Sequence, residues 1–312
     1  MIRIGLVGAG RWGKRYIETL MHMDGVELAH LGSANPGSAR LVPAGCRISP
    51  DRRTVLEDRS LQGIILASPP ATHCELGLAA IGAGIPVLIE KPLTLGSVDA
   101  RRLAAAAAAQ GVLAMTGHTH VFSSAFRALK AQGATLGTLL HTRSRGGNRG
   151  PVRPDATVLW DWGPHDVAMG FDIFDSAANA IRASRVAAQQ LPDGIGEAIA
   201  IDLEFDGGGR SEILVSNIEP SKRRIFEAFF ARGTLAYDDL AEHKLVRRGV
   251  AAEVEEAIAV DASLPLNNLV KEFCACVAAQ RSSHPSLELG VRVVEVLEEC
   301  QVQLDRAPAA GL

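Results

Sequence analysis

The order of apolar runs and helical patterns in the first part of the chain most constrains its fold. Mostly apolar runs lie at residues 2–7, 26–33, 63–67, 86–89 and 112–116, and segments with helical or loop character separate them. Strands buried on both faces have such continuous apolar sequences. Strand–helix alternation is typical of a doubly wound parallel sheet. We therefore expect an α/β domain over residues 1–120.

The pattern changes after residue 120. A helix is expected at 123–132, segments with β character follow near 136–145, 180–190, 196–206, 211–218, 224–231 and 234–237, and helices return at 267–280 and 287–303. Glycines at 207–209 predict a loop or hairpin turn between two of these strands. Strands that follow an alternating section indicate a second, α+β domain with one mostly antiparallel sheet, which we place at residues 121–312.

Composition excludes several classes of partner. The net charge of −3 gives no electrostatic reason to expect nucleic acid or an anionic membrane. No apolar stretch approaches the ~20 residues of a membrane span, and the N-terminus runs directly into a strand, as in a mature fold without an export signal. The five cysteines have no CxxC spacing, so we expect free thiols in a cytoplasmic protein and no metal site.

A glycine motif follows the first apolar run. Gly8-x-Gly10-x-x-Gly13 lies between a predicted strand and a predicted helix, which is the context of the dinucleotide-binding fingerprint. The first glycine makes the tight turn, the second admits the pyrophosphate, and the third lets the helix pack closely on the strand. We expect this loop, including Arg11 and Trp12, to bind a nicotinamide dinucleotide at the helix N-terminus.

The tip of the second predicted strand bears on the choice of cofactor. An acidic residue about 20 residues after the fingerprint binds the adenosine ribose of NAD. Here the sequence is Leu31-Gly32-Ser33-Ala34-Asn35, without an acid that would repel a 2′-phosphate. Arg11 or Arg40 could supply a cation. This pattern favours NADP, although Ser33 could also bind the unphosphorylated ribose of NAD.

A charged tripeptide ends the fourth apolar run. Glu90-Lys91-Pro92 follows Ile85–Ile89, at the carboxyl end of a buried strand, where open α/β sheets bind ligands. A charged pair at such a place is costly unless it is partnered. We therefore expect a cationic group beside the cofactor at the reacting centre.

These motifs resemble the glucose-fructose oxidoreductase/inositol dehydrogenase/MocA family. The similarity is carried by GAGRWG, ASPPATHCELGLAAIGAGIPVLIEKPLTL, GHTHVFSSAFRALK and DWGPHDV, and it covers nearly the whole chain. The resemblance implies a Rossmann domain, an open and mostly antiparallel sheet domain, and NAD(P)-linked oxidation or reduction of a sugar or polyol. GHTHVF and VLWDWGPHD are most similar to the branch that acts on nucleotide sugars. Members often form homodimers or homotetramers through the open sheet.

The resemblance also implies site residues. The family's lysine, aspartate and histidine map onto Lys91, Asp161 and His165. Many members carry another aspartate three residues after the histidine, where this chain has Ala168. Asp166 follows the histidine directly instead, which leaves its role open.

Hydride transfer at a carbinol carbon requires that a base take the hydroxyl proton and that a cation or donor stabilise the oxygen. We expect a helix that starts at 163–164 and runs to Phe171, with His165 in its first turn, where the helix dipole favours a neutral imidazole. His165 is then the general acid/base, Lys91 polarises the oxygen, and Asp161 holds a second hydroxyl or the His–Lys pair. Lys91 as the proton carrier remains an alternative.

Further residues are expected around this centre. Those expected to contact the cofactor are Ser68, Pro69, His73, Glu90 and Lys91, and those expected to contact the substrate, beside the catalytic three, are His118, Arg145 and Trp160. Arginines at 143, 145, 149 and 153 could grip the diphosphate of a nucleotide sugar, or form a solvated loop.

Two other functions are compatible with these motifs. One is a glycosidase that uses transient oxidation by tightly held NAD. The other is a non-catalytic cofactor sensor. The small-molecule substrate itself is not encoded in a readable motif.

Overall fold

The structure is a computed structural model that describes residues 1–153, 156–249 and 255–306. The chain divides into two compact units. The first contains Met1–Thr119 and Leu264–Val294, and the second contains His120–Ser263 and Glu295–Leu312. The predicted boundary near residue 120 coincides with a change of unit. The domain assignment of residues 264–294 differs from the prediction, because these residues pack with the N-terminal segment and not with the rest of 121–312.

The first unit is built on a six-stranded parallel sheet with the order β3-β2-β1-β4-β5-β6. Its strands are β1 (Ile2–Val7), β2 (Val26–Gly32), β3 (Arg47–Ser49), β4 (Gly63–Leu66), β5 (Val87–Glu90) and β6 (Ala114–Gly117). Every residue of β4, β5 and β6 is buried, which explains their uninterrupted apolar sequences. The strand order reverses between β1 and β4, at the crevice where a doubly wound sheet binds its dinucleotide.

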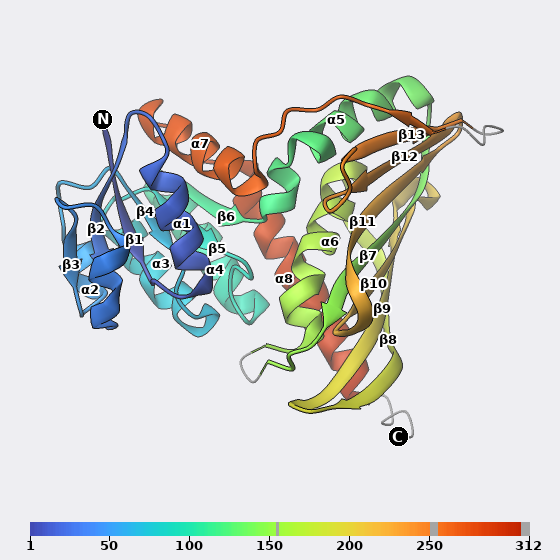
Figure 1. Cartoon of the computed structure of the whole chain (residues 1–312), viewed down its shortest axis with the longest axis horizontal. Coiled ribbons are helices and arrows are strands. Elements are labelled where there is room, and N and C mark those ends of the chain that lie inside the picture. Colours follow the sequence, from blue (N-terminus) through green and yellow to red (C-terminus); the bar gives the residue numbers. More distant parts are fainter. Residues whose placement is uncertain (154–155, 250–254, 307–312) are drawn as a thin grey trace. The chain divides into compact units, whose positions relative to one another are not determined.

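Helices surround this sheet (Figure 1). They are α1 (Arg11–Met21), α2 (Arg53–Leu56), α3 (His73–Gly82), α4 (Ser97–Gln110), α7 (Pro265–Ala278) and the first part of α8 (Pro285–Arg306). The ring of Phe273 in α7 packs against Gly63 at the start of β4, and Ser286 in α8 accepts a hydrogen bond from the backbone N–H of Thr116 in β6. These contacts explain why a C-terminal segment belongs to an N-terminal fold.

The second unit contains an eight-stranded sheet with the order β14-β13-β12-β11-β7-β10-β9-β8. Its strands are β7 (Leu139–Arg149), β8 (Ala178–Leu191), β9 (Gly194–Phe205), β10 (Arg210–Ser216), β11 (Ile218–Phe230), β12 (Gly233–Asp238), β13 (Leu245–Arg248) and β14 (Glu255–Ala257). All neighbours are antiparallel except β7 and β10. The predicted glycine turn joins β9 to β10. The α/β class with a second, mostly antiparallel sheet is therefore confirmed.

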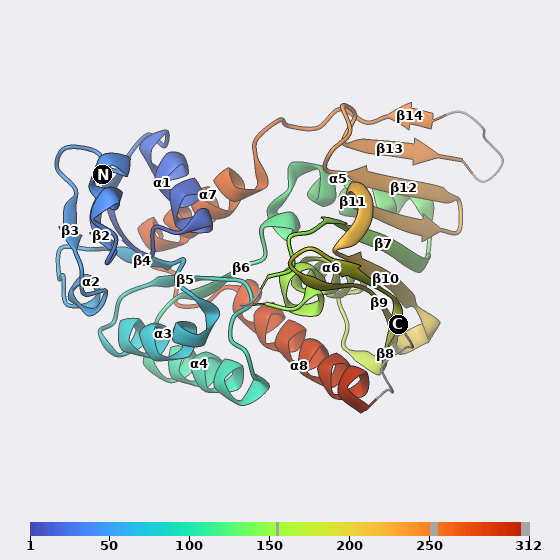
Figure 2. The same ribbon diagram turned by 60° about the horizontal axis from the view of Figure 1, so that its bottom comes forward.

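Helices α5 (Ser124–Gly133) and α6 (Val158–Phe174) lie along one face of this sheet (Figures 1 and 2). Apolar side chains of α5, α6 and strands β11 to β13 form a hydrophobic core between the helices and the sheet. In this core the ring of Phe126 meets that of Phe226 edge-on, with the ring centroids 5.4 Å apart. The second part of α8 packs on α6, where Leu297 contacts Gly163. Sheet and helices thus hold α6 in a fixed place.

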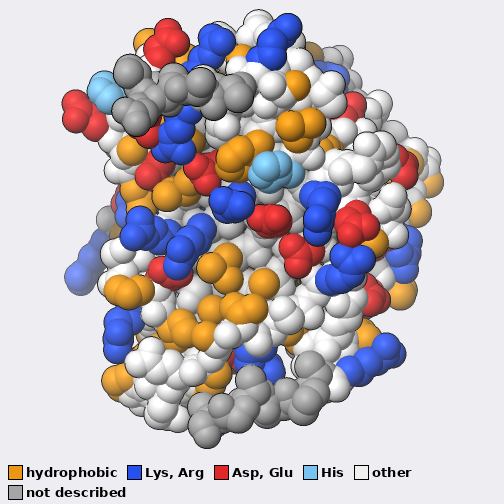
Figure 3. All heavy atoms as spheres, turned by 90° about the vertical axis from the view of Figure 1, so that its right-hand side faces the viewer, with side chains coloured by type: hydrophobic (Ala, Val, Ile, Leu, Met, Phe, Trp, Pro, Cys, Tyr) orange, Lys and Arg blue, Asp and Glu red, His pale blue; other side chains and the backbone are white. Residues whose placement is uncertain are grey.

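The other face of the sheet carries side chains of mixed character. Figure 3 shows hydrophobic side chains among lysine, arginine and acidic side chains on that side. Along β7, Thr142 and Ser144 are buried whereas Arg143 and Arg145 are exposed, as expected when alternate residues point to opposite faces. In the part of the chain that the structure describes, no helix combines the length and apolar character needed to cross a membrane.

Candidate functional site

The glycine loop between β1 and α1 has the shape of a phosphate cradle. Gly8 has a φ of +102°, and an added Cβ there would lie 2.5 Å from the carbonyl oxygen of Ala67. A Cβ at Gly13 would overlap the carbonyl of Gly8. By contrast, a Cβ at Gly10 would meet no protein atom within 4 Å. The loop is therefore closed on the protein side and open at Gly10, which fits a dinucleotide pyrophosphate.

The N-terminus of α1 is available to an anion. Its N-cap residue is Gly10, no side chain caps the helix, and no acidic residue lies in its first turn. Unpaired N–H groups and the positive end of the helix dipole therefore face the loop. Arg11 is exposed, and Trp12 is half-buried beside it.

Ser33 follows the last residue of β2, as predicted. Its Oγ lies 2.8 Å from the Oγ of Ser38, and it accepts a hydrogen bond from the backbone N–H of Asn35. Asn35 in turn caps the N–H of Gly37. This turn contains hydroxyl and amide groups and no carboxylate.

Lys91 follows β5, and the glutamate before it is deeply buried. Glu90 is 4% exposed, and its carboxylate accepts hydrogen bonds from Tyr16 Oη at 2.6 Å and from the backbone N–H of Lys91 at 3.1 Å. Burial raises the pKa of Glu90 to about 7, although Tyr16 and Lys91 oppose that rise. Tyr16 belongs to α1, so the carboxylate links the phosphate-binding helix to the lysine loop.

His73 has a different environment from the one expected of a cofactor contact. It is fully buried, with Nδ1 3.0 Å from the carbonyl oxygen of Pro92 and Nε2 2.9 Å from that of Ser68. Burial lowers its pKa, although the carbonyl oxygens oppose that effect. Its ring therefore joins the loop after β4, with Ser68 and Pro69, to the loop that carries Lys91.

His118 lies directly after β6 and is 1% exposed. Neither ring nitrogen has a hydrogen-bond partner among the residues that the structure describes. Burial and the charge of Lys91 lower its pKa to about 3, so the ring is neutral. A buried polar group without a partner is uncommon in a protein, and one beside Lys91 has the character of a ligand contact.

Helix α6 carries the residues predicted from the second motif. It begins at Val158, five residues earlier than predicted, so the expectation that His165 lies in the first helical turn is wrong. The dipole acts mainly within the first turn and does not account for a neutral imidazole at this position. Asp161 is the acidic residue in that turn, and it accepts a hydrogen bond from Arg153 at 3.1 Å. Asp161 and His165 are spaced i,i+4 and share one face of the helix.

His165 adjoins a polar cluster within the second unit. Its ring meets that of His120 edge-on, with centroids 4.8 Å apart. Nη1 of Arg224 donates to Nε2 of His120, whose Nδ1 lies 3.1 Å from the hydroxyl of Tyr237. An arginine can only donate, so Nε2 of His120 is the acceptor in this contact.

Asp166 occupies the same cluster. It is buried, which raises its pKa to about 6, while Arg224 and Ser144 oppose that rise. A Cβ at Gly146 on β7 would lie 2.9 Å from Oδ2 of Asp166, so only glycine leaves room for this carboxylate. The guanidinium of Arg224 also lies over the ring of Trp162, 4.9 Å from its centroid.

Arg145 is not brought together with these residues. It alternates with Ser144 and Gly146, which contact Asp166, and therefore points to the opposite face of the sheet. There Glu219 Oε1 accepts hydrogen bonds from its Nε at 3.0 Å and its Nη2 at 2.7 Å. Trp160 is also engaged, since its Nε1 donates to Gln301. The predicted substrate contacts of Arg145 and Trp160 remain predictions.

The cysteines are all free thiols. In the described residues, Glu272, Cys276 and His284 place one possible ligand atom each within 4.8 Å of one another. Nδ1 of His284 is 3.1 Å from the backbone N–H of Ser286 and 2.8 Å from its hydroxyl, at the start of α8. The absence of a metal site remains a prediction.

Two residues of interest were missed by the sequence reasoning. Tyr16 is the hydrogen-bond donor to Glu90, and Arg224 is the cation of the second polar cluster. A buried tyrosine in an otherwise apolar helix face was a readable signal, because a buried hydroxyl needs a partner. Arg224 gave no signal, since it lies in a run of three basic residues that resembles a solvated strand end.

Comparisons with known proteins agree with this geometry. The model of the GFO_IDH_MocA family, described as an oxidoreductase family with an NAD-binding Rossmann fold, matches residues 2–118. A solved structure of a proposed oxidoreductase from Magnetospirillum magnetotacticum MS-1 is 39% identical, with a TM-score of 0.89, over 96% of this chain and 99% of that one.

Characterised relatives are more distant. A 4-carboxy-2-hydroxymuconate-6-semialdehyde dehydrogenase of Sphingobium sp. is 27% identical over 98% of this chain and 99% of its own length. Inositol 2-dehydrogenase 2 of Saccharopolyspora erythraea is 29% identical over 62% of this chain and 61% of its own length. Sequence motifs, fold and comparisons agree, and the chain belongs to the GFO/IDH/MocA oxidoreductase family, with an NAD(P)-binding Rossmann fold.

Proposed function

We propose that this protein transfers a hydride between nicotinamide and a carbinol or ketone carbon of a sugar, nucleotide sugar or polyol. One observation carries the proposal. The first unit contains both a glycine loop that is open at Gly10 and, at the ends of strands β5 and β6, Lys91 and His118, whose ring nitrogens have no hydrogen-bond partner among the described residues. The inositol 2-dehydrogenase among the relatives supports a polyol or sugar as substrate.

In this proposal the bound nicotinamide supplies the hydride acceptor or donor. Lys91 donates a hydrogen bond to the reacting oxygen and stabilises its negative charge. His165 takes or returns the hydroxyl proton, and Asp161, on the same helix face, holds a second hydroxyl. Lys91 and His165 belong to different units, so their convergence on one carbinol is part of the proposal.

We further propose NADP as the preferred cofactor. The turn after β2 presents the hydroxyls of Ser33 and Ser38 and no carboxylate, and Arg11 is exposed in the neighbouring loop. A 2′-phosphate would meet no repelling charge from this turn. Replacing Ser33 with Asp should move the ratio of the Kd values toward NAD, and fluorescence titration with NADPH and NADH measures that ratio.

The decisive test is Lys91→Ala. We expect kcat to fall about 10²–10⁴-fold on a panel of sugars, nucleotide sugars and polyols, the range for a lost acid–base or charge-stabilising group. The Kd for NADPH should stay nearly unchanged. Lys271→Ala is the control, because it removes the same charge from an exposed position of α7 in the same unit. Full activity of Lys91→Ala on a substrate that the wild type turns over would refute the assignment.

We also propose an oligomeric state and a cellular location. A homodimer or homotetramer through the face of the sheet shown in Figure 3 would cover hydrophobic side chains there. Equilibrium sedimentation would measure the oligomeric state. The five free cysteines support a cytoplasmic location.

A further inference from the structure

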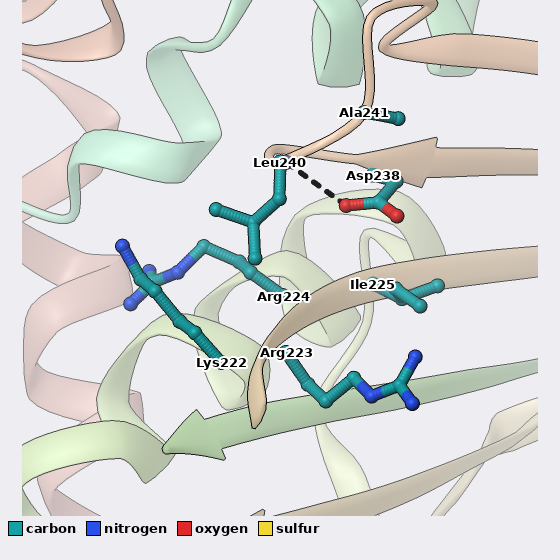
Figure 4. A pocket seen from close by; sticks show the side chains of 7 residues that line it. All are labelled: Lys222, Arg223, Arg224, Ile225, Asp238, Leu240 and Ala241. Atoms are coloured by element: carbon teal, nitrogen blue, oxygen red, sulfur yellow. Dashed lines mark hydrogen bonds between the residues drawn. The ribbon is translucent and has the colours of Figure 1, made fainter. Parts of the chain in front are cut away.

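The three basic residues at the start of the regular part of β11 differ in direction. Strand β11 pairs regularly with β7 from Arg223 onward, with Arg224 opposite Gly146. Alternate residues of a regular strand point to opposite faces, so Arg224 faces α6 and Arg223 points away. Lys222 precedes the regular pairing, and its direction comes from the side chains drawn in Figure 4. Figure 4 shows this arrangement, with Lys222 and Arg224 extending the same way and Arg223 the other way.

Lys222 and Arg224 line a pocket within the second unit. Its other lining residues are Arg223 and Ile225 of β11, Asp238 at the end of β12, and Leu240 and Ala241 of the following turn (Figure 4). The carboxylate of Asp238 accepts a hydrogen bond from the backbone N–H of Leu240 at 2.9 Å and so stabilises its own turn. The lining thus contains three basic residues, one carboxylate that is engaged in its own turn, and a small apolar wall.

Lys222 and Arg224 have no carboxylate ion-pair partner among the described residues, unlike several other arginines of the second unit. Arg145 is paired with Glu219, and Arg153 with Asp161. Within residues 1–153, 156–249 and 255–306, no carboxylate forms an ion pair with Lys222 or Arg224. Arg224 has an acidic neighbour, Asp166, and its charge opposes the rise in the pKa of that carboxyl group.

Arg224 is also held in one orientation. It donates to Nε2 of His120, whose Nδ1 lies 3.1 Å from the hydroxyl of Tyr237, and Tyr237 donates to Asp239 at 3.1 Å. The ring of Trp162 supports its guanidinium from one side. A guanidinium fixed in this way is preorganised to bind the oxygens of a carboxylate or a phosphate.

We propose that Lys222 and Arg224 form a subsite for an oxyanion of the substrate, either a carboxylate or a phosphate. This inference rests on the proposed function and narrows its substrate class from sugars and polyols in general to anionic ones. The subsite lies beside the cluster that contains His120 and His165, so the anionic group is bound on the α6 side of the sheet.

The test is isothermal titration calorimetry of the NADP⁺-saturated protein with three probes: D-glucose, D-glucuronate and UDP-glucose. We expect at least one anionic probe to bind and D-glucose to bind far more weakly. Binding of glucuronate would indicate a carboxylate site, and binding of UDP-glucose would indicate a phosphate site. Raising the salt concentration should weaken binding of the anionic probe, because the contact is between charges.

Variants locate the site. Lys222→Ala should weaken the binding of the anionic probe about tenfold or more, which is the loss expected for a charge-assisted hydrogen bond. Arg224→Lys keeps the charge but loses the planar arrangement of guanidinium N–H donors, so it should also weaken the binding of the anionic probe. Arg210→Ala is the control, since it removes a positive charge from an exposed residue of β10 that does not line the pocket. Lys222 is exposed, so its substitution should leave the melting temperature unchanged.

The outcomes separate this inference from the proposed function. Equal weakening by Arg210→Ala and Lys222→Ala, failure of both anionic probes to bind, or glucose binding as tightly as they do would overturn the subsite. Turnover of an anionic substrate whose KM is the same in Lys222→Ala and in the wild type would overturn it too, while the proposed function stands. Binding of an anionic probe without nicotinamide turnover on any substrate would leave the subsite standing and refute the proposed function.

Discussion

At the scale of single residues, His118 shows how a binding site departs from the rules of a stable core. A buried polar group without a partner costs about 1–3 kcal/mol, and both ring nitrogens of His118 are in that state among the described residues. An isosteric apolar residue would not bear this cost. A site that must receive a ligand hydroxyl retains such a group at the expense of stability.

His118→Leu should therefore raise stability and lower activity together. We expect the free energy of unfolding of the cofactor-free protein to rise by about 1 kcal/mol, because the unpartnered nitrogens are removed. The kcat/KM value should fall at least about tenfold, since a substrate hydrogen bond is lost. Urea unfolding and steady-state kinetics measure the two effects. A destabilised variant with normal kcat/KM would show that His118 is only a packing residue.

Glu90 makes a pH-dependent contribution to stability at the same scale. Its pKa in the folded chain is raised from 4.5 to about 7 by burial, so the folded state holds the proton more tightly than the unfolded state. The stabilising contribution is complete below pH 4.5, decreases as the pH rises through this window, and is lost above about pH 7. The full change corresponds to about 3 kcal/mol.

Glu90→Gln should remove this dependence, because an amide does not titrate. Relative to wild type, the variant should gain stability as the pH rises from 4.5 to 7 and remain constant above that range. Tyr16→Phe removes a hydrogen bond that lowers the pKa of Glu90, so it should move the upper limit of the window to higher pH. Urea unfolding at half-unit pH intervals measures both effects. A constant difference between wild type and Glu90→Gln would contradict this account.

At the scale of elements, the glycines of the β1–α1 loop divide into structural and binding positions. A Cβ at Gly13 would overlap the carbonyl of Gly8, so Gly13→Ala must separate α1 from the loop and should cost several kcal/mol. A Cβ at Gly10 meets no protein atom within 4 Å. Gly10→Ala should keep the melting temperature of the cofactor-free protein and weaken NADPH binding at least about tenfold. Equal loss of stability in both variants would contradict the assignment of Gly10 to the cofactor.

The same scale shows what a single sequence can predict. Every strand of the first sheet except the short β3 was readable, because strands buried on both faces leave continuous apolar runs. The start of α6 was not, since Pro164 suggested a first turn, whereas the structure holds it inside the helix. The directions of Arg145 and Arg224 were also unreadable, because they depend on strand register, which only tertiary pairing fixes.

At the scale of the whole molecule, the C-terminal helix α8 contributes residues to both units. Residues 264–294 belong to the first unit, and the chain from Glu295 belongs to the second. A sequence pattern cannot reveal this division, since α8 is one continuous helix whose apolar positions have the same period throughout. The stability of each unit therefore depends on side chains at the end of the chain.

Two substitutions should each destabilise one unit, which distinguishes their contributions to stability. Phe273 is fully buried and contacts Gly63 of β4, so Phe273→Ala should cost about 3–5 kcal/mol in the first unit. Leu297 is fully buried and contacts Gly163 of α6, so Leu297→Ala should cost about 2–5 kcal/mol in the second. Native-state hydrogen exchange would detect this as lost amide protection in β1 and β4 for Phe273→Ala, and in β9 and β10 for Leu297→Ala. Each variant is the control for the other. Equal loss of protection in both sheets from either substitution would show that the chain unfolds as one cooperative body.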